Sequence, residues 1–231
     1  MNPLELDEVS VSYEGVRALD RVTLSVRGHE LHGLIGSNGA GKTTLNDAVT
    51  GFERATGTVT LMGRRVDGWA PHRRARAGLA RTFQHLELWA DLSVRENLVA
   101  AAQSSGQDKA QVVRAAEMLG LMGDLDRDID ELPHGRQRLV SVARAVAQSP
   151  GLLLLDEPAS GLDSDETSDL GERLLAMREH MAILLIDHDM TLVLAICDRI
   201  TALDRGVVIA EGAPHDVATN DRVREAYLGG A

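Results

Sequence analysis

Eight consecutive residues carry the pattern of a phosphate-binding loop. They read Gly36-Ser37-Asn38-Gly39-Ala40-Gly41-Lys42-Thr43, and Thr44 follows them as a further expected nucleotide-binding residue. Glycines in such a loop let backbone N–H groups turn toward phosphate oxygens, and the lysine places a positive charge on the outer phosphates. The hydroxyl of Thr43 can ligate Mg2+, and a helix that begins here directs its positive end at the same anion. A plain glycine-rich turn is the alternative, but the apolar strand before the motif and the helix after it favour a site for ATP and Mg2+.

A second group of candidate residues is the acidic pair Asp156 and Glu157, which follows the apolar run 152–155. A carboxylate at the C-terminal end of a strand lies where an open α/β sheet binds its ligands. Asp156 can hold Mg2+, partly through water, and Glu157 can then orient or deprotonate the attacking water. Taken alone, the pair could be a charged strand terminus without a role. Beside a phosphate-binding loop, it favours hydrolysis of a bound triphosphate.

The elements expected to position these residues are those of an α/β fold. Alternating polar and apolar residues predict amphipathic strands within the first 30 residues, at 4–13 and 19–28. Short apolar runs predict further strands at 31–36, 57–63, 151–157, 182–187 and 199–204. Helical spacing predicts a mostly helical insert between residues 71 and 133 and helices at 43–51, 137–148, 164–180 and 190–198. Continuous apolar strands between helices indicate a parallel sheet buried on both faces.

Composition and charge limit the possible partners. The 231 residues carry a formal net charge of -11, so a general attraction to nucleic acid or anionic lipid is not expected. The start of the sequence does not read as a signal peptide. The apolar runs are far shorter than the roughly 20 residues of a membrane span, so other chains would have to supply spanning helices. Several arginines, among them Arg74 and Arg81, lie between residues 64 and 81. The simpler interpretation of this cluster is a solvated charged face, and the alternative is a docking patch.

The order of these motifs resembles that of the ATP-binding subunits of ABC transporters over essentially the whole chain. The resemblance implies a P-loop NTPase (RecA-like) core with a mainly parallel sheet, an N-terminal antiparallel β subdomain and a helical insert subdomain. It implies a single ABC ATPase domain over residues 1–231. In that domain, residues 1–84 and 136–231 form the nucleotide-binding core, and residues from about 85 to 135 form the helical subdomain with the signature segment.

Further site residues follow from the resemblance alone. Tyr13 stands where the family places an aromatic ring that stacks on adenine, and a strand tyrosine packed on the core is the alternative. Gln84 matches the glutamine that reaches the metal and the water. His188 matches the histidine that contacts the γ-phosphate. The resemblance therefore assigns catalysis to Lys42, Gln84, Glu157 and His188, and Mg2+ binding to Thr43, Gln84 and Asp156.

The signature segment departs from the family pattern. The usual LSGGQ is replaced by Leu132-Pro133-His134-Gly135-Arg136. By position, Gly135 is a nucleotide-binding residue. The usual serine hydroxyl is missing, and Pro133 has no backbone donor, although it suits a helix start. His134 and Arg136 could supply positive charge instead.

The resemblance also implies partners. In the family, a complete site combines the P-loop of one subunit with the signature of another, so we expect a head-to-tail dimer with a second ABC ATPase subunit. Residues 160–163 resemble the segment that runs along the seam of that dimer. The irregular signature favours a heterodimer, with a homodimer as the alternative. Two transmembrane permease subunits and, indirectly, a periplasmic or extracellular solute-binding protein are implied, as is a peripheral location on the cytoplasmic face of the cell membrane.

Several stretches are similar to the subunits that power uptake of branched-chain or other hydrophobic amino acids. They lie at residues 33–52, 81–98, 132–136, 184–200 and 224–231. Subunits of urea and amide importers are very similar, so another small solute is the alternative. Two further alternatives are a weakly hydrolysing regulatory ABC subunit and a non-transport ABC ATPase. Glu157 and His188 speak against the first, and the short insert without heptads and the acidic charge speak against the second.

Overall fold

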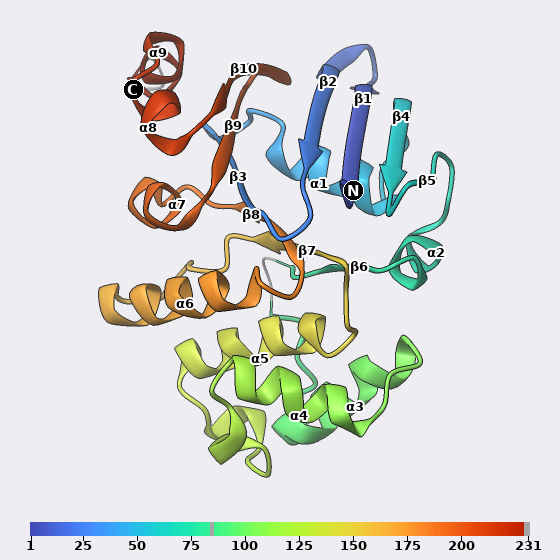
Figure 1. Ribbon diagram of the computed structural model, residues 1–231, viewed down its shortest axis with the longest axis vertical. Helices are drawn as coiled ribbons and strands as arrows, with labels where there is room; N and C mark the ends of the chain where they lie inside the picture. Colours follow the sequence, from blue (N-terminus) through green and yellow to red (C-terminus); the bar gives the residue numbers. More distant parts are fainter. Residues whose placement is uncertain (84–85, 229–231) are drawn as a thin grey trace.

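The computed structural model describes residues 1–83 and 86–228, which form two β-sheets and a set of surrounding helices (Figure 1). The first sheet is antiparallel, with the order β2-β1-β4-β5. Its strands are β1 (Leu4–Tyr13), β2 (Val16–Val26), β4 (Thr56–Leu61) and β5 (Arg64–Arg65). The two alternating strands predicted from the sequence are confirmed as the antiparallel pair β1 and β2, although β2 covers 16–26 rather than 19–28 and the pairing has register shifts between Leu6 and Ser12. This sheet is the antiparallel β subdomain that the resemblance implied.

The second sheet has the order β10-β9-β3-β8-β7-β6. Its strands are β3 (Leu31–Gly36), β6 (Leu79–Arg81), β7 (Leu152–Asp156), β8 (Ala182–Ile186), β9 (Arg199–Asp204) and β10 (Val207–Gly212). Neighbouring strands from β9 to β6 are parallel, and only the β9–β10 pair is antiparallel. Because the parallel strands share one direction, their C-terminal ends lie along one edge of the sheet, where ligands of open α/β folds bind.

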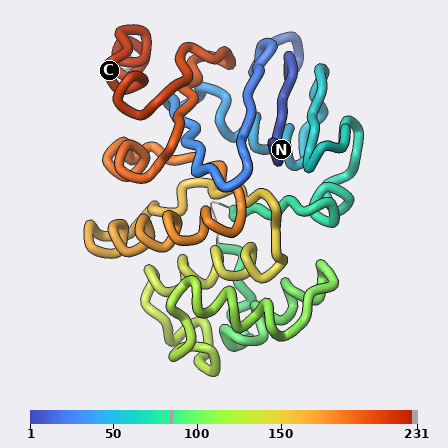
Figure 2. The backbone as a smooth tube through the Cα atoms, viewed as in Figure 1, coloured from blue at the N-terminus to red at the C-terminus, as the bar shows by residue number. Residues whose placement is uncertain are grey.

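The helices lie in distinct places around the sheets. They are α1 (Lys42–Thr50), α2 (Pro71–Arg76), α3 (Val94–Ser104), α4 (Lys109–Met118), α5 (His134–Val146), α6 (Ser164–Met177), α7 (Met190–Ile196), α8 (Pro214–Ala218) and α9 (Asp221–Leu228), with short 3-10 turns at Met122–Asp124 and Ile129–Glu131. Figure 2 shows α3, α4 and α5 together at the end of the molecule opposite the antiparallel sheet. No helix of the described residues has the length and apolar character needed to cross a bilayer.

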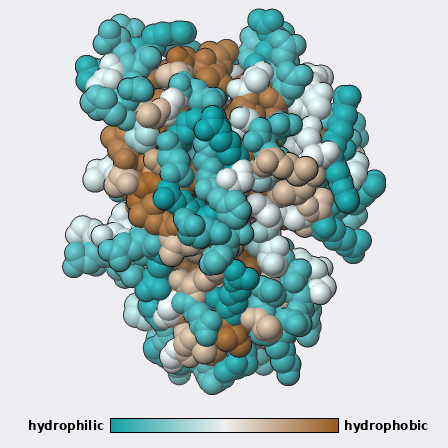
Figure 3. Space-filling view, viewed as in Figure 1, coloured by the Kyte–Doolittle hydropathy of each residue, from teal (hydrophilic) through white to brown (hydrophobic). Residues whose placement is uncertain are grey.

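Two apolar clusters lie on the two faces of the parallel sheet. Along β7, Leu153 and Leu155 belong to the cluster shared with α5 and α6, whereas Leu152 and Leu154 belong to the one shared with α1 and the antiparallel sheet. This alternation follows from the two-residue period of a strand. The strand is therefore buried on both faces, as its continuous apolar run predicted. On the face shown in Figure 3, hydrophobic surface occurs in patches among hydrophilic residues, one of them over α7 and the strands beside it.

Two of the clustered arginines are not on a solvated face. Arg74 is 4% exposed, and its guanidinium donates hydrogen bonds to the carbonyl oxygens of Ala48 (2.7 Å) and Val49 (2.8 Å). It thereby satisfies carbonyls in the last turn of α1, where the helix dipole favours a cation. Arg81 is also buried at its side chain, against Asp47 and Asp156. The simpler interpretation of the arginine cluster is therefore wrong for these two residues.

A buried ionic network joins the starts of β3 and β9. The Nε atom of Arg199 lies 3.1 Å from Oε1 of Glu30, and the backbone N–H of Arg27 donates to Oε2 of Glu30 at 2.5 Å. Nε2 of His32 lies 2.8 Å from the hydroxyl of Thr201. Burial alone would raise the pKa of Glu30, but the neighbouring His32, the hydrogen bond from the backbone N–H of Arg27 and the charge of Arg199 outweigh it, so the pKa lies below its ordinary value. The network stabilises the fold only while Glu30 is ionised.

Candidate functional site

The candidate site lies at the C-terminal edge of the parallel sheet. β3 ends at Gly36, where the phosphate-binding motif begins, and β7 ends at Asp156, the first residue of the acidic pair. β8 separates these two strands in the sheet, and the backbone N–H of Glu157 donates to the carbonyl of Ile186 at its end (2.7 Å). Two motifs 120 residues apart in the sequence are thus one strand apart in the sheet.

The phosphate-binding loop has the backbone shape that requires its glycines. Gly41 has a φ of +106°, and a Cβ atom on it would lie 2.9 Å from the carbonyl oxygen of Ala18. A Cβ atom on Gly36 would lie 2.5 Å from the carbonyl oxygen of Leu203. The helix α1 starts at Lys42 without a side-chain cap. The first N–H groups of this helix therefore have no side chain to satisfy them and can bind an anion.

One cavity of about 470 Å³ brings the two motifs together. Its size is that of an ordinary small-molecule site. The loop, the first turn of α1 and the acidic pair all contribute to its wall. The lining residues are Val16, Arg17, Ala18, residues 38–44, Asp156, Glu157, Ile186 and Arg205. We call this cavity the P-loop cavity.

The ammonium group of Lys42 lies inside the loop. Its Nζ atom donates to the carbonyl oxygens of Gly36 (2.6 Å) and Ser37 (3.1 Å), and the residue is only 8% exposed. Burial lowers the pKa of Lys42, and the negative charges of Glu157 and Asp156 act in the opposite direction. A phosphate group in the cavity would compete with the two carbonyl oxygens for this cation.

Thr43 and Asp156 are the described residues best suited to hold Mg2+. Both line the P-loop cavity, and both offer the oxygen donors that this ion prefers. Among the residues with described positions, no three His, Cys, Asp or Glu side chains form a metal-binding cluster. Such a sparse donor set fits an ion that completes its coordination with phosphate oxygens and water. Burial raises the pKa of Asp156, whereas the hydrogen bond from Asn46 lowers it.

Glu157 and His188 lie side by side at this edge. Nδ1 of His188 is 3.6 Å from Oε1 of Glu157. Glu157 has a φ of 47°, in the left-handed region that side chains rarely adopt, which is a form of local strain often found at functional sites. The side chain of His188 is 61% exposed and does not line the P-loop cavity. The two residues assigned to water activation and to the γ-phosphate are therefore neighbours.

Two residues assigned by resemblance have different outcomes. Tyr13 is 45% exposed, so its side chain is not packed in the core, and that alternative is wrong. Partial burial, followed by the neighbouring Glu53, raises the pKa of Tyr13. Tyr13 does not line the P-loop cavity itself. Gln84 lies outside the described residues, so its assigned role stays a prediction.

The signature segment starts α5, with Pro133 as the residue before its first turn. A Cβ atom on Gly135 would lie 2.2 Å from Oε1 of Glu166, so only glycine fits there as the side chains stand. Arg136 forms an ion pair with Asp124 and donates to the carbonyl of Gly120, so its charge is already used within this part of the fold. No described residue of 132–136 lines the P-loop cavity of the same chain.

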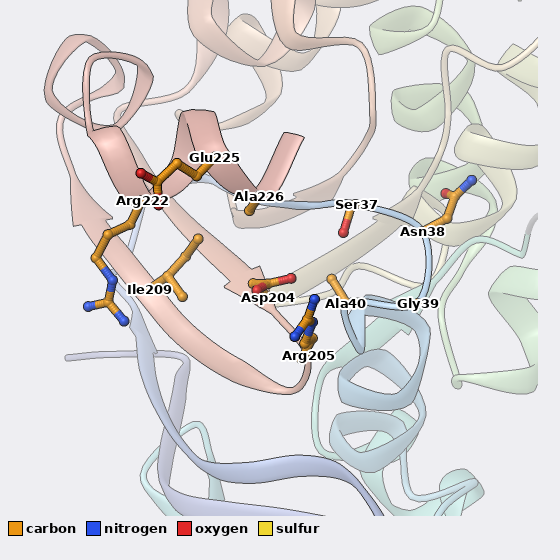
Figure 4. Close-up of a pocket in the computed structure, with 10 residues that line it drawn as sticks. All are labelled: Ser37, Asn38, Gly39, Ala40, Asp204, Arg205, Ile209, Arg222, Glu225 and Ala226. Atoms are coloured by element: carbon orange, nitrogen blue, oxygen red, sulfur yellow. The ribbon is translucent and has the colours of Figure 1, made fainter. Parts of the chain in front are cut away.

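A second cavity of about 470 Å³ lies behind the loop (Figure 4). Residues 37–40 form one side of it, and Arg222, Glu225 and Ala226 of α9 lie opposite, with Asp204 and Arg205 between them. Next to it, the backbone N–H of Gly36 donates to the hydroxyl of Tyr227 on α9 at 2.9 Å. The sequence analysis used residues 224–231 only as a subfamily resemblance, so this contact between α9 and the loop was missed. No local pattern could reveal a contact across 191 residues.

A phosphate-binding loop and an acidic strand end that meet at one edge of a mainly parallel sheet define a P-loop nucleotide-binding domain. The ABC transporter family matches residues 19–160, and relatives match nearly the whole chain. The chain belongs to the ABC transporter family. Residues 207–231 also match a family described as branched-chain amino acid ATP-binding cassette transporter.

Relatives and solved structures agree with this assignment. The chain is 38% identical to the high-affinity branched-chain amino acid transport ATP-binding protein LivG of Salmonella typhimurium, over 99% of this chain and 98% of that protein. It is 35% identical to BraF of Pseudomonas aeruginosa, with the same coverage. The crystal structure of the ADP conformation of MJ1267, an ATP-binding cassette of an ABC transporter, superimposes with a TM-score of 0.91 at 27% identity, over 99% of both chains. The α/β fold class predicted from the sequence is confirmed.

Proposed function

We propose that this chain binds and hydrolyses ATP as a subunit of an ABC importer for branched-chain or other hydrophobic amino acids. The observation that carries the proposal is the P-loop cavity, because residues 38–44, Asp156 and Glu157 line one space. The relatives whose names specify branched-chain amino acid transport support the solute class. The match of residues 207–231 to a branched-chain amino acid family supports the same solute class.

The chemistry of this site is mainly positioning and charge neutralisation. The first N–H groups of α1 and the ammonium of Lys42 hold the phosphates. Thr43 and Asp156 would hold Mg2+, which would supply positive charge to the bound phosphates. Glu157 would accept the proton of the attacking water or orient it, and the imidazole of His188 lies 3.6 Å from its carboxylate. Tyr13, exposed at the end of β1, offers a ring for adenine.

We further propose that two ATPase chains complete each other's sites. The support is that, among the described residues, segment 132–136 does not line the P-loop cavity of its own chain, while His134 at the start of α5 is exposed. A head-to-tail pair would bring Gly135 of one chain to the triphosphate of the other. The absence of the usual serine favours a related but different partner chain. Residues 85–135 are proposed as the helical subdomain that carries this segment.

The remaining partners follow from the family. Two permease subunits would provide the membrane path, and a solute-binding protein would deliver the amino acid to them. This chain would then act at the cytoplasmic face of the membrane as a peripheral subunit. Closure of the ATPase pair on ATP and its reopening after hydrolysis would switch the access of the permeases.

Uptake of radiolabelled solutes tests the proposal. Cells that express the chain with its permeases and solute-binding protein should accumulate leucine, and cells with the Lys42→Ala variant should not. Accumulation of urea instead of leucine would favour the amide-importer alternative. Unchanged leucine uptake with Lys42→Ala would contradict the proposed function.

A further inference from the structure

We infer that Asn46 and Arg81 are positioning residues that hold the carboxylate of Asp156 in the orientation needed to bind Mg2+. The inference rests on the proposed function of the site. Neither residue belongs to the phosphate-binding motif or to the acidic pair, and neither lines the P-loop cavity. Both reach Asp156 from the side of α1 and β6.

Asn46 is a buried polar residue in an apolar position. It lies one turn after Lys42 on α1, next to the buried Leu45, and is 1% exposed. Its Nδ2 atom donates to Oδ2 of Asp156 at 3.0 Å, whereas its Oδ1 atom has no partner among the described residues. Leaving a buried carbonyl oxygen without a partner costs free energy, so packing alone would favour an aliphatic side chain here. The side-chain hydrogen bond from Asn46 to the carboxylate of Asp156 is therefore its distinctive contribution.

Arg81 supports the same oxygen from a second direction. Its guanidinium is 3.7 Å from Oδ2 of Asp156 and 2.7 Å from Oδ1 of Asp47 on α1. The rings of Phe83 and Phe52 lie 4.4 and 5.5 Å from its guanidinium carbon, and the side chain is only 11% exposed. Cation–π contacts and the ion pair with Asp47 thus restrict where this cation can move.

One hydrogen bond, from Asn46, and one ion pair, with Arg81, meet at Oδ2 of Asp156 and restrict how its carboxylate is rotated. Without them, the carboxylate of Asp156 could turn about its Cβ–Cγ bond, because its backbone N–H bond to Thr82 does not restrain the side chain. Groups that orient a metal ligand commonly change metal affinity by about 10- to 100-fold when they are removed. Asn46 and Arg81 should therefore influence Mg2+ binding more strongly than they influence binding of metal-free ATP.

The main test is the Asn46→Leu variant, which keeps the volume and the helix but removes the donor. Mn2+ serves as the probe, and its affinity for the ATP complex is measured by titration of the electron paramagnetic resonance signal. We expect about a 10-fold loss of Mn2+ affinity and less than a 2-fold change in ATP binding measured in EDTA. Val49→Ala, a truncation in the apolar cluster on the same helix, is the control for lost stability and should leave the Mn2+ affinity unchanged.

Several outcomes separate the inference from the proposed function. The inference is overturned if Asn46→Leu binds Mn2+ as tightly as the wild type does. It is also overturned if the variant loses affinity for Mn2+ and for metal-free ATP by the same factor. No binding of ATP by the wild type with or without metal overturns the proposed function itself. Should Asn46→Leu not fold, Arg81→Met tests the same claim: it should weaken Mn2+ binding several-fold, and Arg81→Lys should restore part of the loss. Unchanged Mn2+ affinity in Arg81→Met would contradict the role assigned here.

Discussion

Replacing Glu157 by glutamine should abolish most hydrolysis while leaving ATP binding intact. Glutamine has the same shape, so it can keep the position beside His188, but its amide cannot take a proton from water. The backbone should also remain, because the N–H of Glu157 bonds to the carbonyl of Ile186 whatever the side chain is. The substitution therefore removes the proposed general base with little other change.

The size of the effect follows from the role of the side chain. A general base contributes roughly 10²- to 10⁴-fold to the rate, which corresponds to about 2.7 to 5.4 kcal/mol in the barrier. The carboxylate of Glu157 is partly buried, at 22% exposure, beside an imidazole 3.6 Å away. Its loss should therefore lower the rate by a factor within this range.

The assay is phosphate release in the assembled transporter at saturating Mg-ATP, together with binding of a fluorescent ATP analogue. The Glu157→Gln variant should lower kcat at least 100-fold and change nucleotide affinity less than 3-fold. Glu179→Gln, which removes an exposed carboxylate 3.9 Å from Arg178, is the matched control and should leave both values unchanged. Equal kcat for Glu157→Gln and wild type would refute the catalytic role.

Three further predictions concern the loop and the fold. Gly41→Ala should destabilise the protein by about 1–3 kcal/mol and weaken ATP binding, because φ at this residue is +106° and the added Cβ would clash with the carbonyl of Ala18. Denaturant unfolding with and without ATP measures the stability and the ATP binding. An unchanged unfolding midpoint would contradict the loop conformation described here. Tyr227→Phe should cost about 1–3 kcal/mol, since the N–H of Gly36 loses its acceptor, and an equal melting temperature would show that the contact is unimportant. Because the pKa of Glu30 in the folded protein lies below its ordinary value of 4.5, the ionised side chain should contribute its full stabilisation above pH 4.5 and lose it as the pH falls through the folded-state pKa. The stability of the Glu30→Gln variant should therefore depend less steeply on acid pH. Identical acid-unfolding profiles for the variant and the wild type would contradict this role of Glu30.

The local sequence was sufficient to predict an element where that element has its own clear hydrophobic pattern or end signal. The run Leu152–Asp156 is a strand buried on both faces, and Gly51 ends α1 in a left-handed conformation, as a glycine after a helix suggests. The position of the acidic pair beside the loop followed from a rule of topology, because the ends of parallel strands share an edge. These features need no knowledge of distant contacts.

Other features depend on partners far along the chain. β6 covers only Leu79–Arg81 within an arginine-rich stretch of helical spacing, and it is a strand because it pairs with β7. The loop contact of Tyr227 and the bond from Asn46 to Asp156 span 191 and 110 residues. Over a much shorter separation, Arg136 was expected to supply positive charge to the nucleotide, but its ion pair with Asp124 uses that charge within the fold. Such long-range pairings follow only from the folded chain.

Calorimetric titration of the purified chain with ATP tests most directly whether the two motifs share one ligand. With Mg2+ present, the wild type should bind one ATP per chain, and both Lys42→Ala and Asp156→Ala should weaken that binding, with the Asp156 effect disappearing when EDTA replaces Mg2+. Wild-type protein that retains no ATP, or an Asp156→Ala variant that binds Mg-ATP as tightly as the wild type, would contradict the account.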